Sequence, residues 1–256
     1  MNDIAVTPIR AFSDNYIWLL HRDGEAFVVD PGDAAPVLEA LASRRLALKG
    51  ILITHHHLDH VGGLLQLKQA TGCPVWGPTN SPATELDHTL TENDAVTVLG
   101  SGFRVLAVPG HTLDHIAFYC GDQDLLFCGD TLFVGGCGRV FEGTPSQMRA
   151  SLAKLSGLPA ATRVFCAHEY TLSNLRFAAL VEPDNQALQQ TLRECEERRR
   201  QEQPTVPSLM GDELRYNPFL RWSSPAIRQT LADQGRLVDD SDDGVFAAVR
   251  EWKNTA

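Results

Sequence analysis

The sequence predicts an α/β fold in which a domain of strands and helices, residues 1–170, precedes a smaller α-helical domain, residues 171–256. Up to about residue 170, short apolar runs bounded by turn residues alternate with helical segments, a pattern typical of sheets and helices packed in layers. Beyond Tyr170 the strand-like runs stop and longer helical segments take over. The predicted boundary is therefore at residue 170.

Each element is predicted from its own local pattern. Strands are expected where apolar runs lie between turn residues, at residues 4–10, 16–21, 26–30, 48–54, 74–76, 96–99, 103–108, 115–120, 125–128 and 163–167. Helices are expected in the first domain at residues 34–45, 64–70 and 146–155, and in the second at residues 172–181, 185–203, 225–232 and 244–253. The charged stretch 194–202 is interpreted as an exposed helix face.

Composition excludes several classes of protein. The chain has 256 residues, of which 43% are hydrophobic and 21% charged, as in ordinary globular domains. No apolar run approaches the ~18 residues of a membrane span, and the N-terminus lacks the basic and apolar regions of a secretory signal. The net charge of −10 argues against a general nucleic-acid binder, which needs a basic face.

The six cysteines are scattered and form no C-x-x-C pair: Cys73, Cys120, Cys128, Cys137, Cys166 and Cys195. Most lie in apolar, strand-like runs, so we interpret them as reduced structural thiols in a cytoplasmic protein. A catalytic role for Cys137 is the alternative. It is the weaker one, because no base lies nearby in the sequence.

The most informative stretch is residues 54–60, THHHLDH, which directly follows a predicted strand. A strand that ends in this way delivers several imidazoles and a carboxylate to one point. Neutral imidazole and carboxylate are suitable ligands for zinc, iron and similar ions. A polar loop or an affinity tag is the alternative, but the run is internal and is interrupted by Asp59. The stretch therefore predicts a metal site.

Three further strands run into a turn that carries a potential ligand. These ligands are His111, Asp130 and His168. One such histidine alone is more often structural than a ligand. Strand ends in a layered α/β fold, however, gather at one edge of the sheet, where sites usually form. The repetition of the pattern favours ligands.

Together the candidates number seven: His55, His57, Asp59, His60, His111, Asp130 and His168. Seven ligands exceed what one tetrahedral ion uses, so they predict two ions that share a bridge. Such a pair can hold a bridging hydroxide and polarise the bond that it attacks. His56 is expected to point away from the ions, and His115 to be structural or to support a ligand. His21 and His88 have no evident partners.

Four motifs together resemble the metallo-β-lactamase superfamily: residues 54–60, 109–112 (PGHT), 129–133 (GDTLF) and 167–170 (AHEY). Within it, the chain is similar to the glyoxalase II, or hydroxyacylglutathione hydrolase, family. Residues 136–144 (GCGRVFEGT) and Arg250 with Lys253 narrow the resemblance to this family. It covers nearly the whole chain. It implies an αββα sandwich that binds the metals, residues 1–170, followed by a helical glutathione-binding domain, residues 171–256.

The resemblance also implies how the seven ligands are shared. It assigns three to each ion and one to both: His55, His57 and His111 to the first, Asp59, His60 and His168 to the second, and Asp130 to the bridge. A hydroxide completes the bridge, and Asp59 helps to orient it. The cofactors implied are two divalent ions, zinc first, with iron or manganese as alternatives.

Five residues are implied in binding the glutathione part of the substrate. Arg139 stands where family members carry Lys or Arg. Phe141 stands where some carry Tyr, so one phenolic hydrogen bond would be missing. Tyr170 matches the tyrosine of the family's AHEY-type motif. Arg250 and Lys253 share one face of a predicted helix and can grip a carboxylate. Their alternative role is that of a solvated helix end.

The implied reaction is hydrolysis of S-D-lactoylglutathione, and of related S-(2-hydroxyacyl)glutathiones, to glutathione and D-lactate by the bridging hydroxide. This is the second step of methylglyoxal detoxification. The implied partner is this small molecule, with no nucleic acid, no membrane and a monomeric chain. Because a thiolate is a good leaving group, the reaction requires no strong general acid.

Three other classes of function agree less well with the motifs of the sequence. A lactonase, β-lactamase or general thioesterase on the same fold needs neither Arg250 and Lys253 nor the helical domain. A persulfide dioxygenase shares the first motif but lacks such a helical domain, and a di-iron reductase usually carries Glu where this chain has His57. A non-catalytic member would have lost ligands, and all seven are present.

Overall fold

The computed structural model describes residues 3–256 and divides the chain into two compact units. Unit 1 consists of Met1–Ala107 with Asp114–Gly129, and unit 2 consists of Val108–Leu113 with Asp130–Ala256. The chain thus leaves unit 1 after Ala107 for one short loop and leaves it again after Gly129. These units do not coincide with the division at residue 170, which stays a prediction.

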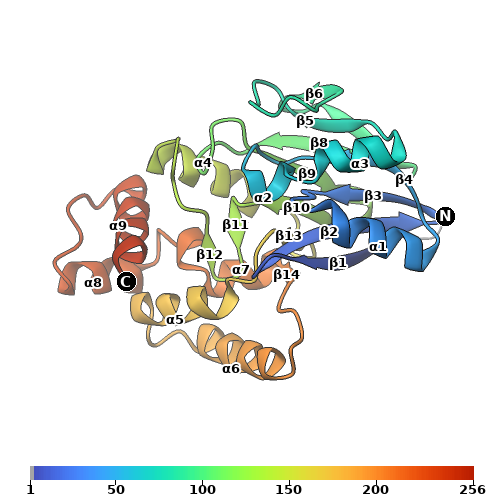
Figure 1. Cartoon of the computed structure of the whole chain (residues 1–256). Coiled ribbons are helices and arrows are strands. Elements are labelled where there is room, and N and C mark those ends of the chain that lie inside the picture. The colour runs from blue at the N-terminus through green and yellow to red at the C-terminus, as the bar shows by residue number, and fades with distance from the viewer. Residues whose placement is uncertain (1–2) are drawn as a thin grey trace. The chain divides into compact units, whose positions relative to one another are not determined.

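The first sheet of unit 1 has the strand order β1-β2-β3-β4-β5-β6. The strands are β1 (Ala5–Ala11), β2 (Asn15–Arg22), β3 (Glu25–Val29), β4 (Ala47–Leu52), β5 (Val75–Pro78) and β6 (His88–Leu90). The first three pair antiparallel, whereas β3 to β6 pair in parallel (Figure 1). Parallel pairing requires crossover connections, and helices supply the first two.

Two of the three helices of this unit cover one face of the first sheet. The helices are α1 (Ala34–Arg44), α2 (Leu58–Val61) and α3 (Leu64–Thr71). Val37 of α1 and Leu67 of α3 join Leu19, Val28 and Ile51 of the sheet in one buried cluster. Each such side chain contributes roughly 1.5–3 kcal/mol by leaving water. This apolar layer makes β4 a rigid support for the residues that follow it.

The second sheet of unit 1 is antiparallel and includes the order β10-β9-β8-β7. Its elements are β7 (Ala95–Val98), β8 (Ser101–Ala107), β9 (Ile116–Cys120), the 3₁₀ turn η1 (Gly121–Gln123) and β10 (Leu125–Gly129). Since β8 and β10 both run opposite to β9, they end at the edge where β9 begins. There the Ile116 amide donates to the Thr54 carbonyl at 2.9 Å. The residues after β4 therefore lie at that same edge.

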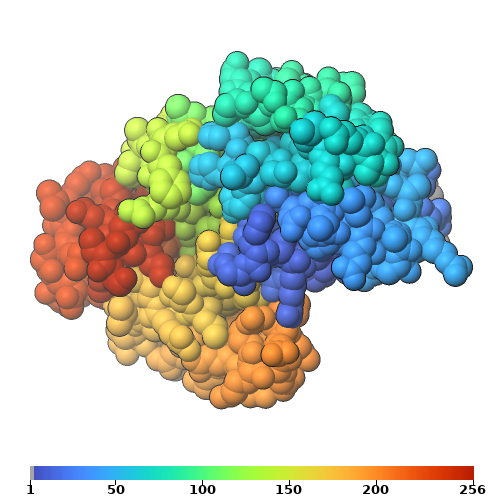
Figure 2. Space-filling model, in the orientation of Figure 1, coloured from blue at the N-terminus to red at the C-terminus, as the bar shows by residue number. Residues whose placement is uncertain are grey.

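Unit 2 is mostly helical. Its elements are β11 (Leu132–Phe133), β12 (Gly136–Cys137), α4 (Pro145–Ser156), β13 (Arg163–Cys166), α5 (Thr171–Val181), α6 (Gln186–Arg200), β14 (Ser208–Leu209), α7 (Met210–Tyr216), η2 (Pro218–Leu220), α8 (Pro225–Asp233) and α9 (Asp242–Thr255). Two antiparallel pairs, β11 with β12 and β13 with β14, accompany the helices. Helices α5 and α6 lie side by side in Figures 1 and 2.

Aromatic side chains hold the helices of unit 2 together. Phe219 of η2 packs against Phe177 of α5 and Phe246 of α9, with ring centroids 6.2 and 5.9 Å apart. Trp252 of α9 meets Phe177 edge-on at 5.6 Å. Such pairs add about 0.5–1.5 kcal/mol each to the area that they bury. Helix α9 is therefore anchored on the side that also carries Arg250.

The long elements follow the sequence predictions, and the short ones do not. The helix predicted over 185–203 ends at Arg200, and the strands β6, β11, β12 and β14 were not predicted. Strands of two or three residues are too short to show a hydrophobic period that could be recognised in the sequence. No helix within residues 3–256 is both long enough and apolar enough to span a membrane.

Candidate metal centre

His55 is held in unit 1 by a chain of hydrogen bonds that begins at Asp30. The Thr54 amide and hydroxyl both donate to the Asp30 carboxylate, at 2.8 and 2.7 Å. The Thr54 hydroxyl oxygen can then accept from His55 Nδ1, 3.0 Å away. This arrangement protonates Nδ1 and leaves the lone pair on His55 Nε2. Nε2 is the atom that faces Nδ1 of His57, at 3.2 Å.

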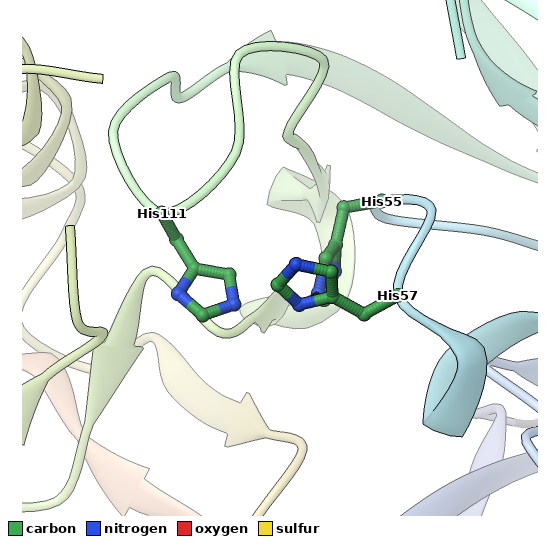
Figure 3. Close-up of side chains that lie close together, drawn as sticks. All are labelled: His55, His57 and His111. Atoms are coloured by element: carbon green, nitrogen blue, oxygen red, sulfur yellow. Dashed lines mark hydrogen bonds between the residues drawn. The ribbon is translucent and has the colours of Figure 1, made fainter. Parts of the chain in front are cut away.

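Figure 3 draws the imidazoles of His55 and His57 beside one another in the loop that precedes α2. The His55 side chain is fully buried and that of His57 is partly exposed. Two imidazole nitrogens that lie this close, one of which carries a lone pair, suit a shared cation. Within unit 1, then, Nε2 of His55 and Nδ1 of His57 are two adjacent candidate ligand atoms.

Asp59 and His60 form a second pair in the same unit, on the short helix α2. Nε2 of His60 lies 3.4 Å from Oδ2 of Asp59, and Nδ1 of His60 lies 3.1 Å from Oδ2 of Asp30. Asp30 and Asp59 thus place one carboxylate beside each nitrogen of the His60 ring. Asn15 donates to Oδ2 of Asp59 at 2.9 Å and limits its rotation.

Asp30 is a functional residue that the sequence predictions missed. It is buried, and it supports both His60 and, through Thr54, His55. Its backbone has φ 53°, in the left-handed region, which aspartate tolerates better than most residues. It directly follows β3. The strand-end pattern that identified Asp130 was therefore present here too.

The two remaining histidines of this region, His115 and His56, differ in where their rings lie. His115 is buried and stacks on the His55 ring, with centroids 4.5 Å apart and planes 14° from parallel. His56 points to Asp114, with 3.0 Å between Nδ1 and Oδ1. The Gly129 backbone, at φ 48°, passes so close that a Cβ there would lie 2.4 Å from Thr54 Oγ1. The His55 ring is thus enclosed on several sides.

In unit 2, the Asp130 carboxylate lies between two imidazoles. Oδ2 is 3.4 Å from Nε2 of His111, and Oδ1 is 3.4 Å from Nε2 of His168. All three residues are at least nine-tenths buried. One oxygen of the carboxylate thus faces each histidine, which is the arrangement of a bridging ligand.

The proton of His111 is assigned by a backbone carbonyl. Nδ1 of His111 donates to the Arg139 carbonyl at 2.7 Å, and a carbonyl can only accept. Nε2 therefore presents a lone pair to the Asp130 oxygen, at a distance longer than an ordinary hydrogen bond. Two electron-rich atoms facing each other in a buried place repel unless a cation lies between them. The donor set of this cluster thus fits a metal ion.

The residues assigned to substrate binding lie near these ligands within unit 2. Tyr170 stacks on the His168 ring with centroids 4.6 Å apart and planes 4° from parallel. Phe141 meets the His111 ring edge-on at 5.2 Å and is 60% exposed. The Arg139 guanidinium lies 5.6 Å above the Phe141 ring. An aromatic surface with a cation thus borders the unit 2 ligands.

Arg250 and Lys253 differ in how they are held on α9. Arg250 is only 8% exposed and donates from Nη1 to the Cys137 carbonyl at 2.9 Å. Lys253 donates to the carbonyl and hydroxyl of Ser173, both at 3.2 Å. Partial burial, and then the charge of Arg250, lower the pKa of the Lys253 ammonium below its usual range. A solvated helix end does not describe Arg250.

The surroundings of the thiols disfavour a nucleophilic role. None of the six cysteines forms a disulfide, and all six are buried. Burial raises the pKa of the Cys137 thiol, although the nearby Arg250 charge opposes that shift. A raised pKa disfavours the reactive thiolate at neutral pH. The geometry therefore gives no support to catalysis by Cys137.

The fold and its two clusters of His and Asp side chains define a class of protein. Residues 11–168 match the metallo-beta-lactamase superfamily, and residues 169–256 match the hydroxyacylglutathione hydrolase C-terminus. The predicted α/β fold class with its helical C-terminal part is thereby confirmed. One solved structure similar to this chain is TTHA1623 in a di-iron-bound form (TM-score 0.63, 26% identity, 84% of this chain and 100% of that one).

Curated relatives narrow the class further. The hydroxyacylglutathione hydrolase of Chromohalobacter salexigens is 53% identical over 254 residues, which cover 98% of this chain and 99% of that protein. That of Albidiferax ferrireducens is 53% identical over 250 residues, which cover 96% and 98% respectively. The chain belongs to the hydroxyacylglutathione hydrolase family, as the motifs predicted.

Proposed function

We propose that this protein is a metallohydrolase that cleaves the thioester of S-(2-hydroxyacyl)glutathiones, S-D-lactoylglutathione first among them, to glutathione and the hydroxy acid, D-lactate. The observation that carries the proposal is the identity of about half of all residues, over nearly full length, with relatives named for this activity. The clusters of His and Asp side chains in each unit support the proposal that the enzyme uses metal ions. In this role the protein would complete methylglyoxal detoxification.

The proposed cofactors are two divalent ions with seven ligands. One ion takes the three imidazoles drawn in Figure 3, the second takes two imidazoles and a carboxylate, and one carboxylate is shared: His55, His57 and His111; Asp59, His60 and His168; and Asp130. The imidazole-rich donor set favours zinc, with iron or manganese as alternatives. When bound, the ions supply a nucleophilic water of lowered pKa and stabilise negative charge on the thioester oxygen.

The residues of the chain have separable tasks in this reaction. The Thr54 hydroxyl and the Arg139 carbonyl accept from Nδ1 of His55 and His111, so that Nε2 of each ring stays basic. The Asp30 carboxylate holds Thr54 and lies beside the His60 ring. Asn15 fixes Asp59, which orients the attacking water. The leaving thiolate needs no protonation to depart, and no additional acid is assigned.

The glutathione part of the substrate meets the cationic and aromatic side chains of unit 2. Arg139 and Lys253 attract its carboxylates, and Arg250 can add a further donor. Tyr170 and the exposed ring of Phe141 provide apolar contact beside the ligands. Of these residues, Arg250 and Lys253 belong to the proposed glutathione-binding domain, residues 171–256. Tyr170 directly precedes it, and Arg139 and Phe141 lie in the loop after β12.

The proposed setting follows from the same chemistry. The partner is a small anionic thioester, with no nucleic acid and no membrane, and the working unit is a monomer. Six free, buried thiols favour the reducing cytoplasm.

The test is a steady-state assay of the purified, metal-analysed protein. Loss of thioester absorbance is followed for S-D-lactoylglutathione and for a thioester without glutathione. We expect about two metal ions per chain and turnover that strongly prefers the glutathione thioester. Bound metal without turnover of either would disprove the substrate assignment, and lactones and persulfides would then be tested.

A further inference from the structure

The hairpin β11–β12 connects two parts of the unit 2 ligand cluster. It begins two residues after Asp130 and ends two residues before Arg139, whose carbonyl accepts from His111. At the open end of the hairpin, the Gly138 amide donates to the Thr131 carbonyl at 3.2 Å. A Cβ at Gly138 would lie 1.9 Å from the Asp130 carbonyl oxygen and 3.2 Å from His111 Nδ1. The path of this hairpin therefore sets where Asp130 and His111 stand.

Buried side chains from the C-terminal helices hold this hairpin by its backbone. Asn217 donates to the carbonyls of Phe133 and Gly136 at 3.1 and 3.0 Å. Glu213, which is fully buried, accepts from the Gly135 amide at 3.0 Å and from Asn217 at 2.9 Å. The turn of the hairpin is thus fixed by hydrogen bonds from α7 and the residue that follows it.

Arg250 of α9 holds the last residues of the same segment. Its Nη1 donates to the Cys137 carbonyl at 2.9 Å and approaches the Gly138 carbonyl at 3.5 Å. Its guanidinium lies 5.0 Å above the Phe219 ring, which fixes its position. Gly138 in turn lies so close to Asp130 and His111 that a Cβ added to it would meet both residues. One side chain near the end of the chain is therefore two contacts away from two proposed metal ligands.

We propose that Arg250 is a positioning residue for the metal centre, which acts through the hairpin β11–β12 on His111 and Asp130 in addition to any contact with substrate. This inference rests on the proposed metal site. It separates Arg250 from Lys253, whose hydrogen bonds go to Ser173 of α5 and not to the hairpin. Removal of Arg250 frees the carbonyls that orient residues 137–139, and the His111 acceptor then shifts.

The experiment compares Arg250→Met with Lys253→Met, a matched change on the same helix. Metal affinity is measured by competition with a chelator, and ligand geometry from the visible spectrum of the cobalt-substituted protein. We expect Arg250→Met to weaken metal binding by about 10–100-fold, as loss of an outer support typically does, and to change the cobalt spectrum. Lys253→Met should leave both unchanged and raise only KM. Arg250→Lys, which keeps the positive charge and a hydrogen-bond donor, should restore part of the metal affinity.

The alternatives give different results. If Arg250→Met keeps wild-type affinity and spectrum while KM rises, Arg250 only grips substrate and the inference is wrong. If only the melting temperature of the metal-free protein falls, the role is merely structural, and the inference is again wrong. If Arg250→Met does not fold, the affinity and spectrum of Arg250→Lys decide in the same way. A wild-type protein that binds no metal would overturn both this inference and the proposed function.

Discussion

The two clusters of proposed ligands are supported by different means. In unit 1 the proposed ligands lie within residues 54–60, and side chains support them: Asp30 contacts His60 and Thr54, and Asn15 contacts Asp59. In unit 2 the proposed ligands come from three separate strand ends, and a backbone carbonyl supports His111. The first arrangement depends on a few carboxylate and amide groups. The second depends on the path of a hairpin, and so on everything that holds the hairpin.

This difference predicts that the two clusters respond differently to substitutions. Changes that weaken the unit 1 cluster should be confined to residues that contact the ligands directly. The unit 2 cluster should also respond to changes in α7 and α9, because those helices hold β11–β12. The following predictions test this distinction, from the largest expected effect to the smallest.

The largest effect is expected at Asp130, which faces His111 and His168 with one oxygen each. Asp130→Ala should remove the shared ligand, lower the metal content below two ions per chain and reduce kcat by more than about 100-fold. Metal analysis with steady-state kinetics checks this. Asp122→Ala, at an exposed position in the preceding turn, is the control and should match wild type. Full metal loading with normal kcat would contradict the bridging assignment.

A smaller effect is expected at Asp30. Asp30→Asn tolerates the backbone at φ 53° but removes the charge beside His60 and one of the two oxygens that accept from Thr54. Metal affinity should fall by roughly 10–100-fold in a chelator competition. Asp33→Asn, three residues on, keeps an N-cap for α1 and should not change the affinity. Equal affinities for the two variants would show that Asp30 does not support the ligands.

The third prediction concerns pH and the buried carboxyl that holds the hairpin. Burial raises the pKa of Glu213 above its usual value of 4.5, although its hydrogen bonds oppose the shift. A raised folded-state pKa contributes stability that is present below the unfolded-state value and lost as pH rises through the folded value. Each unit of such a shift corresponds to about 1.4 kcal/mol.

Glu213→Gln should remove this dependence while keeping a side chain of the same shape. The melting temperature of the variant minus that of wild type should therefore increase from about pH 4 to about pH 8. Thermal unfolding at several pH values measures the difference, and Glu194→Gln at an exposed position of α6 serves as control. A difference that does not change with pH would mean that Glu213 does not titrate on unfolding.

The smallest effect is expected at Phe141, whose ring is 60% exposed beside His111. Phe141→Tyr adds a hydroxyl that can donate to the substrate, and one hydrogen bond is worth about 0.5–1.5 kcal/mol. KM for the glutathione thioester should fall by about 2- to 10-fold, with metal content unchanged. An unchanged KM would place the substrate away from this ring.

Much of the site could be predicted from strand ends alone. His111, Asp130 and His168 each follow an apolar run, and the structure places the three together in unit 2. Asp30 fits the same pattern, but a single carboxylate after a predicted strand is not specific enough to predict that it supports ligands. The hairpin β11–β12 could not be predicted, since its strands of two residues are held by Glu213, Asn217 and Arg250 from more than seventy residues away.

The sequence by itself determined the chemical class of this protein and its longer elements. Ligand identity, hydrophobic period and strand-end position are local properties, and each can be recognised within about ten residues. Only the tertiary structure decided which nitrogen of His55 and of His111 carries the proton, and which group accepts it. It also showed Arg250 buried against the hairpin, away from the solvent expected at a helix end. These outcomes depend on hydrogen bonds between distant segments, which form only when the chain has packed.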